Sequence, residues 1–569
     1  MKRKILLILI LALAAILRAW KLDAVPVSLF ADELDVGYHA YSILKTGRDY
    51  TGNLAIFFVN SSADKKAPLY SYLTVPTVAM FGISPLGVRL PAALFGILGI
   101  LFFYLVIDLW TKNKNIALLG ALLLTVSPWH IHYSRWGFEG TLMLFLFLIS
   151  FYFFLKSLND GKWIVVSAFI FSLSAYAYHS AKVFLPLILI SILVIWWKDI
   201  KKVSRKYLIF AVLLLALLNG PLVLSSIFGG STERFGSLSI FNDPKNEGEI
   251  GFDKVRDEQM GEKYARLFHN KATLVFSKIA NNYLDSFSTQ FLFTRGDTNL
   301  RHSILQNGEF YKYQFIFLIL GLLFFAIKPM NKKYKAFILS WVFLAPIPSI
   351  ITTSGGNHAS RLLFLLPPLV FFVTLGVYHS YFYFPKENSP MVYLGNTLRK
   401  IYVLILGLTF IASFIFYQHN YWVHYPDDSQ KWWHAGFKEA IQSAVSEGNN
   451  YDRVIISQAD EPALIFFLGY SRYPPDQFQK KYPLTKVDVA EFGSISKLDN
   501  YYFPPIGQGF DLYSLGSVLS PKTLYLATFK EINLDLVREP ERVPKDIKLL
   551  KSITYPSGDP AFYLFEKAI

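Results

Sequence analysis

The sequence contains no cysteine, which excludes disulfide bonds, thiolate catalysis and cysteine-ligated zinc. Charge is scarce as well: charged residues make up 17% of the 569 positions, against 53% hydrophobic and 17% aromatic residues. A typical soluble domain carries more charge, about 25%. Together with a mean hydropathy of +0.34, this composition excludes an ordinary soluble domain and indicates a membrane protein.

The chain has a net charge of +15, but its basic residues occur in short clusters between apolar runs. This distribution is typical of loops that face anionic lipid, and not of a groove that binds nucleic acid. We therefore expect membrane lipids as partners and no nucleic acid.

Apolar runs near the length of a membrane helix recur along the chain, and they predict about eleven transmembrane helices. The runs lie near residues 5–20, 86–109, 115–128, 138–155, 163–179, 183–197, 208–226, 313–327, 336–352, 361–382 and 401–417. The first run also resembles a signal peptide, because "MKRK" precedes it and Ala12-Leu13-Ala14 resembles a cleavage site. A retained anchor is favoured, because apolar residues continue to the interfacial residues Arg18 and Trp20.

Basic connections alternate with much less basic ones, which predicts a cytoplasmic N-terminus in a multi-pass cell-membrane protein. The basic connections are "MKRK", "TKNKN", "KSLNDGK", "KDIKKVSRKY", "KPMNKKYK" and the stretch from Lys386 to Lys400. The outer side then receives residues 21–85, 127–140, 227–312, 353–361 and everything after about 418.

The tail from 418 to 569 changes character, since polar and proline-rich segments alternate with short strand-like runs such as "RVIIS" and "TLYLATF". It predicts a small extracytoplasmic C-terminal α/β domain. The expected fold is thus an α-helical polytopic membrane domain over 1–417, with interfacial helices in the outer loop 21–85 and a long outer loop at 227–312, followed by the tail domain over 418–569.

The stretch "SLFADELDVGYHAYSILKTGRD", residues 28–49, follows the first apolar run and places three carboxylates, Asp32, Glu33 and Asp35, within four positions. Its pattern predicts a short helix from Asp32 to Lys45 that ends at Gly47. Asp32 and Asp35 would share one face near the positive end of this helix. Capping of the helix is the alternative explanation for the acidic residues.

Further charges lie at the outer ends of the predicted spans. Lys65 and Lys66 are cations on a face where basic loops are otherwise avoided, so a local anionic partner is expected. Arg89 lies at the mouth of the next span and is a candidate for substrate binding, with snorkelling to the interface as the alternative.

A third cluster, "SPWHIHYSRWGFEG", contains His130, His132, Arg135 and Glu139. Arg135 and Glu139 are candidates for substrate contacts, with a simple helical ion pair as the alternative. Two imidazoles without a third ligand are weak evidence for a metal.

The fourth cluster is "GGNHASRLLFLLPP", in which His358 and Arg361 share a predicted helical face suited to a lipid phosphate. The segment "FTRGDTNLRHSILQNGEFY", residues 293–311, contains Asp297 and Arg301. These two residues either line an acceptor entrance or belong to an ordinary solvent-facing loop.

Carboxylates and cations thus collect on one membrane face. This inventory fits the transfer of a group from a lipid phosphate, with a carboxylate as general base and cations that stabilise the departing phosphate. Neither a P-loop nor a Rossmann glycine fingerprint is present, which agrees with a donor already carried on a lipid.

Four segments, "ADELDVGYHAYSILKTGRD", "KKAPLYSYL", "SPWHIHYSRWGFE" and "NHASRLLFLLPPLVFF", resemble the C-type (GT-C) glycosyltransferases. Within that superfamily they resemble the branch of protein O-mannosyltransferases and lipid A aminoarabinose transferases. The resemblance implies a multispanning helical fold and inverting transfer of a sugar from a polyprenyl-phosphate donor to a protein, lipid or polysaccharide acceptor. It leaves the need for a divalent cation open.

The resemblance also implies roles for individual residues. Asp32 becomes the catalytic base, and Glu33 orients it or helps to hold a cation. Lys66 contacts the phosphate, although Ala67 replaces the first proline of the family's Lys-Pro-Pro-Leu segment. Arg135 and Glu139 match a charged pair that is either structural or involved in donor and metal contacts. His358 and Arg361 are assigned to the carrier phosphate.

The expected function is therefore glycosyl transfer at the outer membrane face. A transporter or flippase of lipid-linked sugars is the main alternative, but it would be expected to bury ionisable residues midway through its spans. A noncatalytic scaffold gives no reason for acidic and basic clusters to converge on one face.

Overall fold

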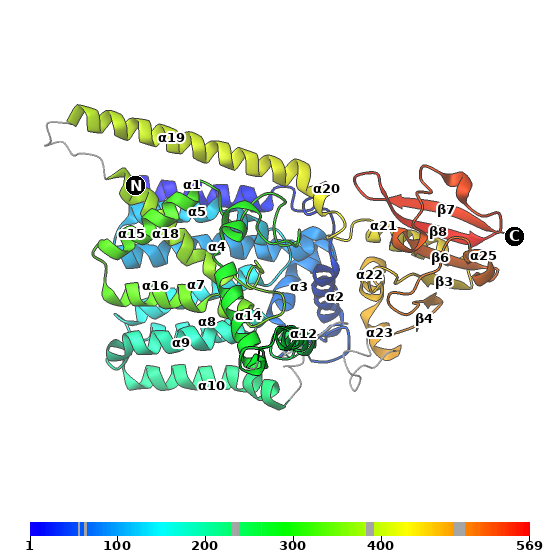
Figure 1. The fold of residues 1–569 in the computed structure, drawn as a ribbon, viewed down its shortest axis with the longest axis horizontal. Helices are drawn as coiled ribbons and strands as arrows, with labels where there is room; N and C mark the ends of the chain where they lie inside the picture. Colours follow the sequence, from blue (N-terminus) through cyan, green and yellow to red (C-terminus); the bar gives the residue numbers. More distant parts are fainter. Residues whose placement is uncertain are drawn as a thin grey trace. The chain divides into compact units, whose positions relative to one another are not determined.

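The computed structural model describes residues 1–54, 57–61, 65–228, 236, 238–262, 264–382, 392–481 and 495–568. The chain divides into two compact units, and each is described by itself (Figure 1). The bundle unit comprises Met1–Trp20, Ala92–Ser134 and Glu139–Asn420. The sheet unit comprises Lys21–Pro91, Arg135–Phe138 and Tyr421–Ile569. The first part of the basic stretch that starts at Lys386 lies outside the described residues.

The regular elements described in the bundle unit are helices, and an isolated β-bridge joins Ser239 to Thr352. It contains α1 (Lys2–Ala19), most of α4 (Pro85–Thr111), α5 (Lys114–Thr125), α6 (Pro128–Tyr133), α7 (Gly140–Ser157), α8 (Trp163–Ala175), α9 (His179–Ile200), α10 (Arg205–Phe228), α12 (Lys245–Gln259), α13 (Ala265–Phe268), α14 (Lys271–Asp285), η1 (Gln290–Thr294), α15 (Gln314–Ile327), α16 (Lys332–Leu344), α17 (Ile347–Ile350), η2 (Leu363–Leu365), α18 (Leu366–Tyr381) and α19 (Val392–His419).

Each of the eleven apolar runs falls on one of these helices. Within the described residues, six helical stretches are long and apolar enough to cross a membrane: Pro85–Thr111, Gly140–Ser157, His179–Ile200, Arg205–Leu224, Leu363–Tyr381 and Thr397–Ser429. Four shorter apolar helices accompany them. The multispanning helical character is therefore confirmed, whereas the count of eleven spans stays a prediction.

Aromatic side chains and close helix contacts hold the bundle together. The ring of Trp110 on α4 packs against Phe371 on α18, with ring centroids 5.4 Å apart. Helices α15 and α18 run side by side (Figure 1). Their approach depends on Gly321, where a Cβ atom would lie 1.8 Å from the backbone oxygen of Phe372. Small residues permit such contacts between membrane helices.

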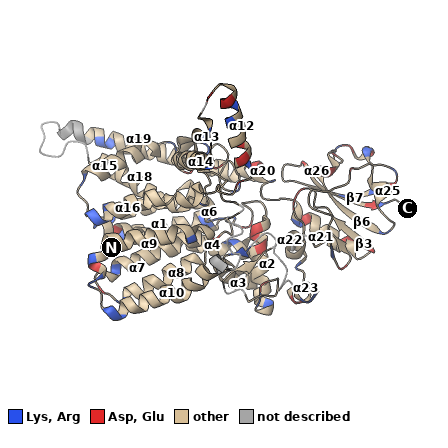
Figure 2. Cartoon of the chain, turned by 60° about the horizontal axis from the view of Figure 1, so that its bottom comes forward, with Lys and Arg blue, Asp and Glu red and all other residues tan. Residues whose placement is uncertain are grey.

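Basic loops gather at one end of the bundle helices (Figure 2). Lys333 at the start of α16 forms an ion pair with Asp199 at the end of α9. Gly161, in the loop between α7 and α8, lies against Val203 in the loop between α9 and α10. These three connections therefore share one end, as their alternation in the sequence predicts. The side of the membrane that this end faces stays a prediction.

The sheet unit contains a six-stranded mixed sheet in the order β4-β5-β3-β6-β8-β7. The strands are β3 (Arg453–Ile456), β4 (Lys497–Leu498), β5 (Tyr501–Tyr502), β6 (Thr523–Thr528), β7 (Ile547–Thr554) and β8 (Pro560–Lys567). Strand β3 pairs in parallel with β5 and β6, and the other pairs are antiparallel. The strand-like runs of the tail are thus strands in the structure.

Helices and one hairpin complete the sheet unit. They are α2 (Ala31–Thr46), α3 (Leu69–Phe81), α20 (Tyr425–Ser429), α21 (Phe437–Gly448), α22 (Leu464–Ser471), α23 (Pro475–Lys481), α25 (Leu515–Val518), α26 (Phe529–Ile532), η5 (Pro540–Arg542) and the strands β1 (Val59–Asn60) and β2 (Lys65–Lys66). The π-helical turn η3 (Asn420–His424) lies at the boundary between the two units.

The segment 21–85, predicted to be an outer loop, folds together with the tail, an arrangement that the sequence did not predict. The Tyr38 hydroxyl donates to the Tyr473 carbonyl at 2.9 Å, and the Tyr470 hydroxyl donates to the Leu29 carbonyl at 3.0 Å. Gly469 on α22 leaves room for Leu34, whose side chain would lie 2.5 Å from an added Cβ atom. Helix α2 is therefore packed against protein along this side. Its location at a membrane interface and the domain limits 1–417 and 418–569 stay predictions.

Candidate functional site

Helix α2 carries the first group of candidate residues. It runs from Ala31 to Thr46 and ends at Gly47, which has a left-handed φ of 71°, so the predicted helix and its end are confirmed. The N-cap is Phe30, and no side chain caps the helix. Asp32 and Glu33 lie in the first turn, where the helix dipole favours negative charge. The N-cap residue forms no side-chain cap, but acidic residues are favoured in the first turn of any helix, so this explanation stays open beside a catalytic one.

Lys66 joins the two carboxylates that the helical spacing places on one face. Its Nζ lies 2.7 Å from Oδ1 of Asp32 and 3.0 Å from Oδ2 of Asp35. The lysine reaches this position from β2, which pairs with β1 in the register Val59 to Lys66. We call Asp32, Asp35 and Lys66 the Asp32 cluster. The side chain of Asp32 is 48% exposed, whereas those of Asp35 and Lys66 are buried.

The buried side of the Asp32 cluster is fixed by aromatic neighbours. The Tyr50 hydroxyl donates a 2.6 Å hydrogen bond to Oδ1 of Asp35. The ring of His39 stacks on Tyr50 with centroids 4.1 Å apart. His39 is fully buried, and burial lowers the pKa of its imidazole, so a neutral ring is expected. Asp35 is thus held between a tyrosine and a lysine.

Lys66 stays charged in this setting. Burial alone would lower the pKa of its ammonium group, but the carboxylates of Asp32 and Asp35 raise the pKa above its ordinary value. The cluster therefore contains one solvent-accessible carboxylate, Asp32, beside the charged ammonium of Lys66. The buried carboxylate of Asp35 contacts the same ammonium.

Glu33 and Arg89 form a second ion pair, and both side chains are completely buried. Nε and Nη2 of Arg89 each donate to one oxygen of Glu33 at 2.8 Å. The Gly137 amide donates to the same carboxylate at 2.6 Å. Arg89 also donates to the carbonyls of Pro26 and Ser28. The pair thus ties α2, the start of α4 and residue 137 together, and neither side chain has accessible surface within the described residues.

Arg135 lies in a buried aromatic environment. Its guanidinium is 4.6 Å from the ring of Trp422, and Nε donates to the Tyr421 hydroxyl at 3.1 Å. Nη2 donates to the Val25 carbonyl at 3.0 Å. Arg135 follows the end of α6, and Glu139 immediately precedes α7 at Gly140. The two residues therefore do not share a helix.

The histidines of the third segment have separate partners in the bundle unit. Nδ1 of His130 lies 2.6 Å from Nη2 of Arg18, and Nε2 of His132 lies 2.7 Å from the Arg301 carbonyl. Glu139, also in the bundle unit, is buried at the start of α7.

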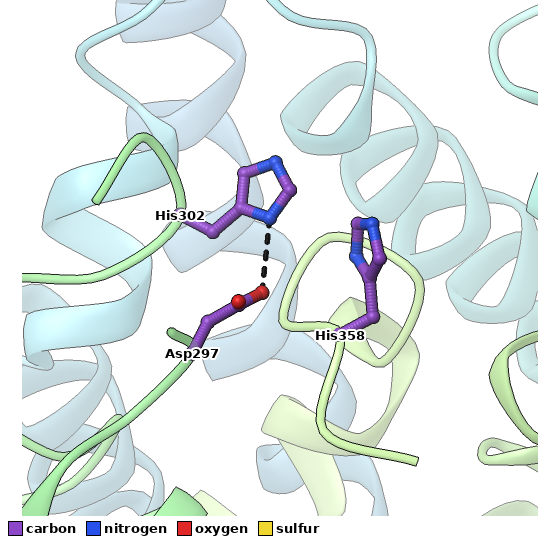
Figure 3. Close-up of side chains that lie close together, drawn as sticks. All are labelled: Asp297, His302 and His358. Carbon is purple, nitrogen blue, oxygen red and sulfur yellow. Dashed lines mark hydrogen bonds and ion pairs between the residues drawn. The ribbon is translucent and has the colours of Figure 1, made fainter. Parts of the chain in front are cut away.

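Three residues of the bundle unit meet in a group that has the composition of a metal site (Figure 3). One ligand atom each from Asp297, His302 and His358 lies within 4.8 Å of the others. We call these residues the His358 cluster. Nδ1 of His302 is 2.9 Å from Oδ2 of Asp297, and the Ala359 amide donates to the same oxygen at 3.0 Å. The cluster thus joins the loop after η1 to the loop before η2.

Burial governs the charges in the His358 cluster. It lowers the pKa of His358 well below its ordinary value, and the positive charges of His302 and Arg361 act in the same direction. Burial raises the pKa of Asp297, but the hydrogen bond from His302, the two neighbouring imidazoles and the Asn299 amide together outweigh this effect, so the net shift is downward. Arg361 follows His358 by one turn and donates to the Thr352 hydroxyl.

The structure brings together some of the sequence candidates and adds others. Asp32 and Lys66 meet in the sheet unit, as do Glu33 and Arg89 in a separate pair. His302 was not singled out, although it follows Asp297 by five residues in the motif-like segment. Asp35 was not among the predicted site residues, and its contact with Lys66 depends on a strand that the sequence pattern did not reveal.

Comparisons with known proteins give the fold a family context. Residues 65–223 match the family model described as dolichyl-phosphate-mannose-protein mannosyltransferase. No curated protein matches the sequence. The solved structure of ArnT from Cupriavidus metallidurans bound to undecaprenyl phosphate is 11% identical, with a TM-score of 0.53 over 98% of this chain and 97% of that chain.

A second solved structure is the archaeal oligosaccharyltransferase AglB from Archaeoglobus fulgidus, in complex with an inhibitory peptide and a dolichol-phosphate. It is 14% identical, with a TM-score of 0.50 over 82% of this chain and 63% of that chain. This chain has the fold of the GT-C glycosyltransferases. The resemblance expected from the four sequence segments is thereby confirmed. Residues 65–223, which the family model matches, run from the start of β2 into α10.

Proposed function

We propose that this GT-C protein transfers a sugar from a polyprenyl-phosphate donor to an acceptor hydroxyl, with inversion at the anomeric carbon. The observation that carries the proposal is the Asp32 cluster, in which a half-exposed carboxylate lies 2.7 Å from a buried lysine ammonium. Support for a lipid-phosphate donor comes from the undecaprenyl phosphate and dolichol-phosphate bound in the ArnT and AglB structures. The matched mannosyltransferase model supports a sugar as the transferred group.

In the proposed reaction, Asp32 accepts the proton of the acceptor hydroxyl. The acceptor oxygen forms a bond to the anomeric carbon as the bond between that carbon and the phosphate oxygen breaks. The polyprenyl phosphate leaves with the electron pair of the broken bond. Lys66 has more than one hydrogen to donate, so it can orient Asp32 and stabilise the charge that develops on the phosphate.

Asp35 completes this arrangement as a positioning residue. It is buried, contacts Lys66 at 3.0 Å, and itself accepts a hydrogen bond from Tyr50. We assign Glu33 and Arg89 to the scaffold, because a fully buried bidentate pair has no path to a substrate without unfolding the segment. Arg135 is assigned to the scaffold because its side chain is likewise completely buried.

The remaining roles rest on the resemblance. Arg361 and His358 stay assigned to the carrier phosphate, and Glu139 stays a candidate for donor contacts. The outer membrane face, the cytoplasmic N-terminus and an extracytoplasmic tail follow from the distribution of basic loops.

The test is an assay with the purified full-length protein and a radiolabelled polyprenyl-phosphate sugar. Release of free polyprenyl phosphate that requires an added acceptor is expected, together with a product whose anomeric configuration is opposite to that of the donor. Movement of the intact lipid-linked sugar across a vesicle membrane without bond cleavage would instead establish the transporter alternative.

A further inference from the structure

We propose that the His358 cluster, formed by Asp297, His302 and His358, is a site for one divalent transition-metal ion of the zinc type. His358 is also assigned to the carrier phosphate in the proposed function, but metal binding is measured without substrate and is therefore tested apart from glycosyl transfer.

The donor set determines the kind of metal. Two imidazoles and one carboxylate form a mixed nitrogen and oxygen set, which suits Zn²⁺ and neighbouring transition metals. Mg²⁺ and Ca²⁺ prefer sets made of oxygen ligands, and the cluster supplies a single carboxylate. Three protein ligands leave a fourth tetrahedral position for water.

The spacing of the side chains fits such an ion after small movements. Metal to ligand distances near 2.1 Å in a tetrahedral site correspond to ligand to ligand separations of about 3.4 Å. The contact between Nδ1 of His302 and Oδ2 of Asp297, at 2.9 Å, is slightly shorter than this, and the full set lies within 4.8 Å. The three ligand atoms therefore already lie close to the spacing that one ion requires (Figure 3).

The backbone around the cluster is already organised. The Asn299 amide donates to Oδ1 of Asp297 at 2.9 Å, and the Ala359 amide donates to Oδ2 at 3.0 Å. Gly296, directly before Asp297, has a φ of 71°, and a Cβ atom there would lie 1.9 Å from the Ser303 hydroxyl. This turn brings His302 back toward Asp297. The carboxylate is thus fixed before any ion binds, which lowers the ordering cost of binding.

The proposed ion would connect two loops that are far apart in the sequence. Asp297 and His302 follow η1, whereas His358 precedes η2. The Arg361 amide donates to the His358 carbonyl at 3.1 Å, so fixing His358 also fixes the turn that carries Arg361. The ion therefore acts as a cross-link at the outer loops of the bundle.

Metal content is the first measurement. The full-length protein, freed of any polyhistidine tag and treated with a chelator, is equilibrated with Zn²⁺ and then exchanged into metal-free buffer. We expect about one Zn²⁺ per chain by elemental analysis, retained in millimolar Mg²⁺. His302→Gln, His358→Gln and Asp297→Asn should each reduce the bound Zn²⁺ at least tenfold.

His269→Gln is the matched control. His269 contacts Asp257 at 2.6 Å, which resembles the pair in the cluster, but no second imidazole completes a group there among the described residues. This variant should keep its full Zn²⁺ content. A wild-type protein with no more Zn²⁺ than the three variants, or an equal loss in His269→Gln, would overturn the proposal.

The shift in unfolding temperature on addition of Zn²⁺ is the second measurement, and it can be made on variants that are less stable than the wild type. Zn²⁺ should raise the unfolding temperature of the wild-type protein and of His269→Gln, because a ligand that binds only the folded state stabilises it. The same addition should leave the unfolding temperature of Asp297→Asn unchanged. An equal Zn²⁺ shift in Asp297→Asn and wild type would place the bound metal elsewhere and refute the site.

Discussion

Asp32 and Glu33 are neighbours in the first turn of α2, yet each forms an ion pair of a different kind. Asp32 is half exposed beside Lys66, whereas Glu33 and Arg89 are completely buried and share two 2.8 Å hydrogen bonds. Consecutive helical residues point about 100° apart, so one faces solvent while the other faces the protein interior. Adjacent acidic residues can therefore differ in role: Asp32 is accessible to a substrate, whereas Glu33 contributes to the stability of the fold.

The two pairs should therefore respond differently to mutation. Loss of Glu33 leaves the Arg89 charge uncompensated in the interior, whereas loss of the half-exposed Asp32 leaves Lys66 paired with Asp35. The variants below test this division, from the largest expected effect to the smallest.

Glu33→Gln should give the largest loss of stability. Removing the carboxylate leaves the guanidinium of Arg89 buried without a counter-charge, at a cost of about 3–5 kcal/mol in the free energy of unfolding. Denaturant or thermal unfolding in detergent measures the change. Glu439→Gln is the control, because Glu439 and Lys551 form an exposed pair at 3.1 Å worth about 0.2–1 kcal/mol. Equal effects of the two substitutions would contradict the assignment of Glu33 to the scaffold.

Lys66→Ala should affect transfer strongly. It removes the cation that contacts Asp32 and, in the proposed reaction, stabilises the donor phosphate, so kcat/KM for the donor should fall about 100-fold, or about 2.7 kcal/mol. Steady-state assays with a lipid-linked donor measure this value. Lys65→Ala removes the neighbouring lysine of the same strand and should change kcat/KM by less than about threefold. If kcat/KM of Lys66→Ala also changed by less than about threefold, the assignment of Lys66 to the catalytic site would be wrong.

Asp35→Asn should have a smaller effect on the same reaction. Lys66 keeps its contact with Asp32 but loses its buried support, so kcat should fall about tenfold, or about 1.4 kcal/mol, with little change in KM. Tyr50→Phe removes only the 2.6 Å hydrogen bond to Asp35 and should lower kcat less. An increase in KM at constant kcat would indicate a role of Asp35 in substrate binding instead of positioning.

Lys66 should contribute no pH dependence between pH 6 and pH 9. Its pKa in the folded protein lies above the ordinary value, which is about 10.4 for lysine. The corresponding stability is fully present below the unfolded pKa and is lost only as the pH rises toward the folded pKa. The difference in unfolding free energy between wild type and Lys66→Met should therefore be constant over this range. A slope within it would show that Lys66 titrates there.

Much of the helical fold could be predicted from the sequence, because the signals are local. All eleven apolar runs fall on helices, and α2 ends at Gly47 as its left-handed conformation requires. The contact of Asp32 and Asp35 with one lysine also follows the three-residue spacing of a helix. These features depend on periodicity and on single residues, which a sequence displays directly.

The sequence did not distinguish the accessible Asp32 from the buried Glu33, because the environment of each residue depends on distant partners. Arg89 lies 56 residues after Glu33, and burial of that pair depends on tertiary packing. The His358 cluster joins Asp297 and His302 to a residue more than 50 positions away. The packing of α2 against α22 likewise needs contacts between the two ends of the chain. Such contacts leave no periodic pattern in a single sequence.

The most direct test of the account is the transfer rate of Asp32→Asn, measured under single-turnover conditions with bound polyprenyl-phosphate sugar and saturating acceptor. The substitution removes the proposed base but costs at most about 1 kcal/mol of stability, because Asp32 is half exposed. We predict a 10²- to 10⁴-fold slower transfer, with the unfolding temperature nearly unchanged, whereas Asp23→Asn, which alters another exposed carboxylate of the same loop, transfers at the wild-type rate. A rate for Asp32→Asn within twofold of wild type would contradict the central claim.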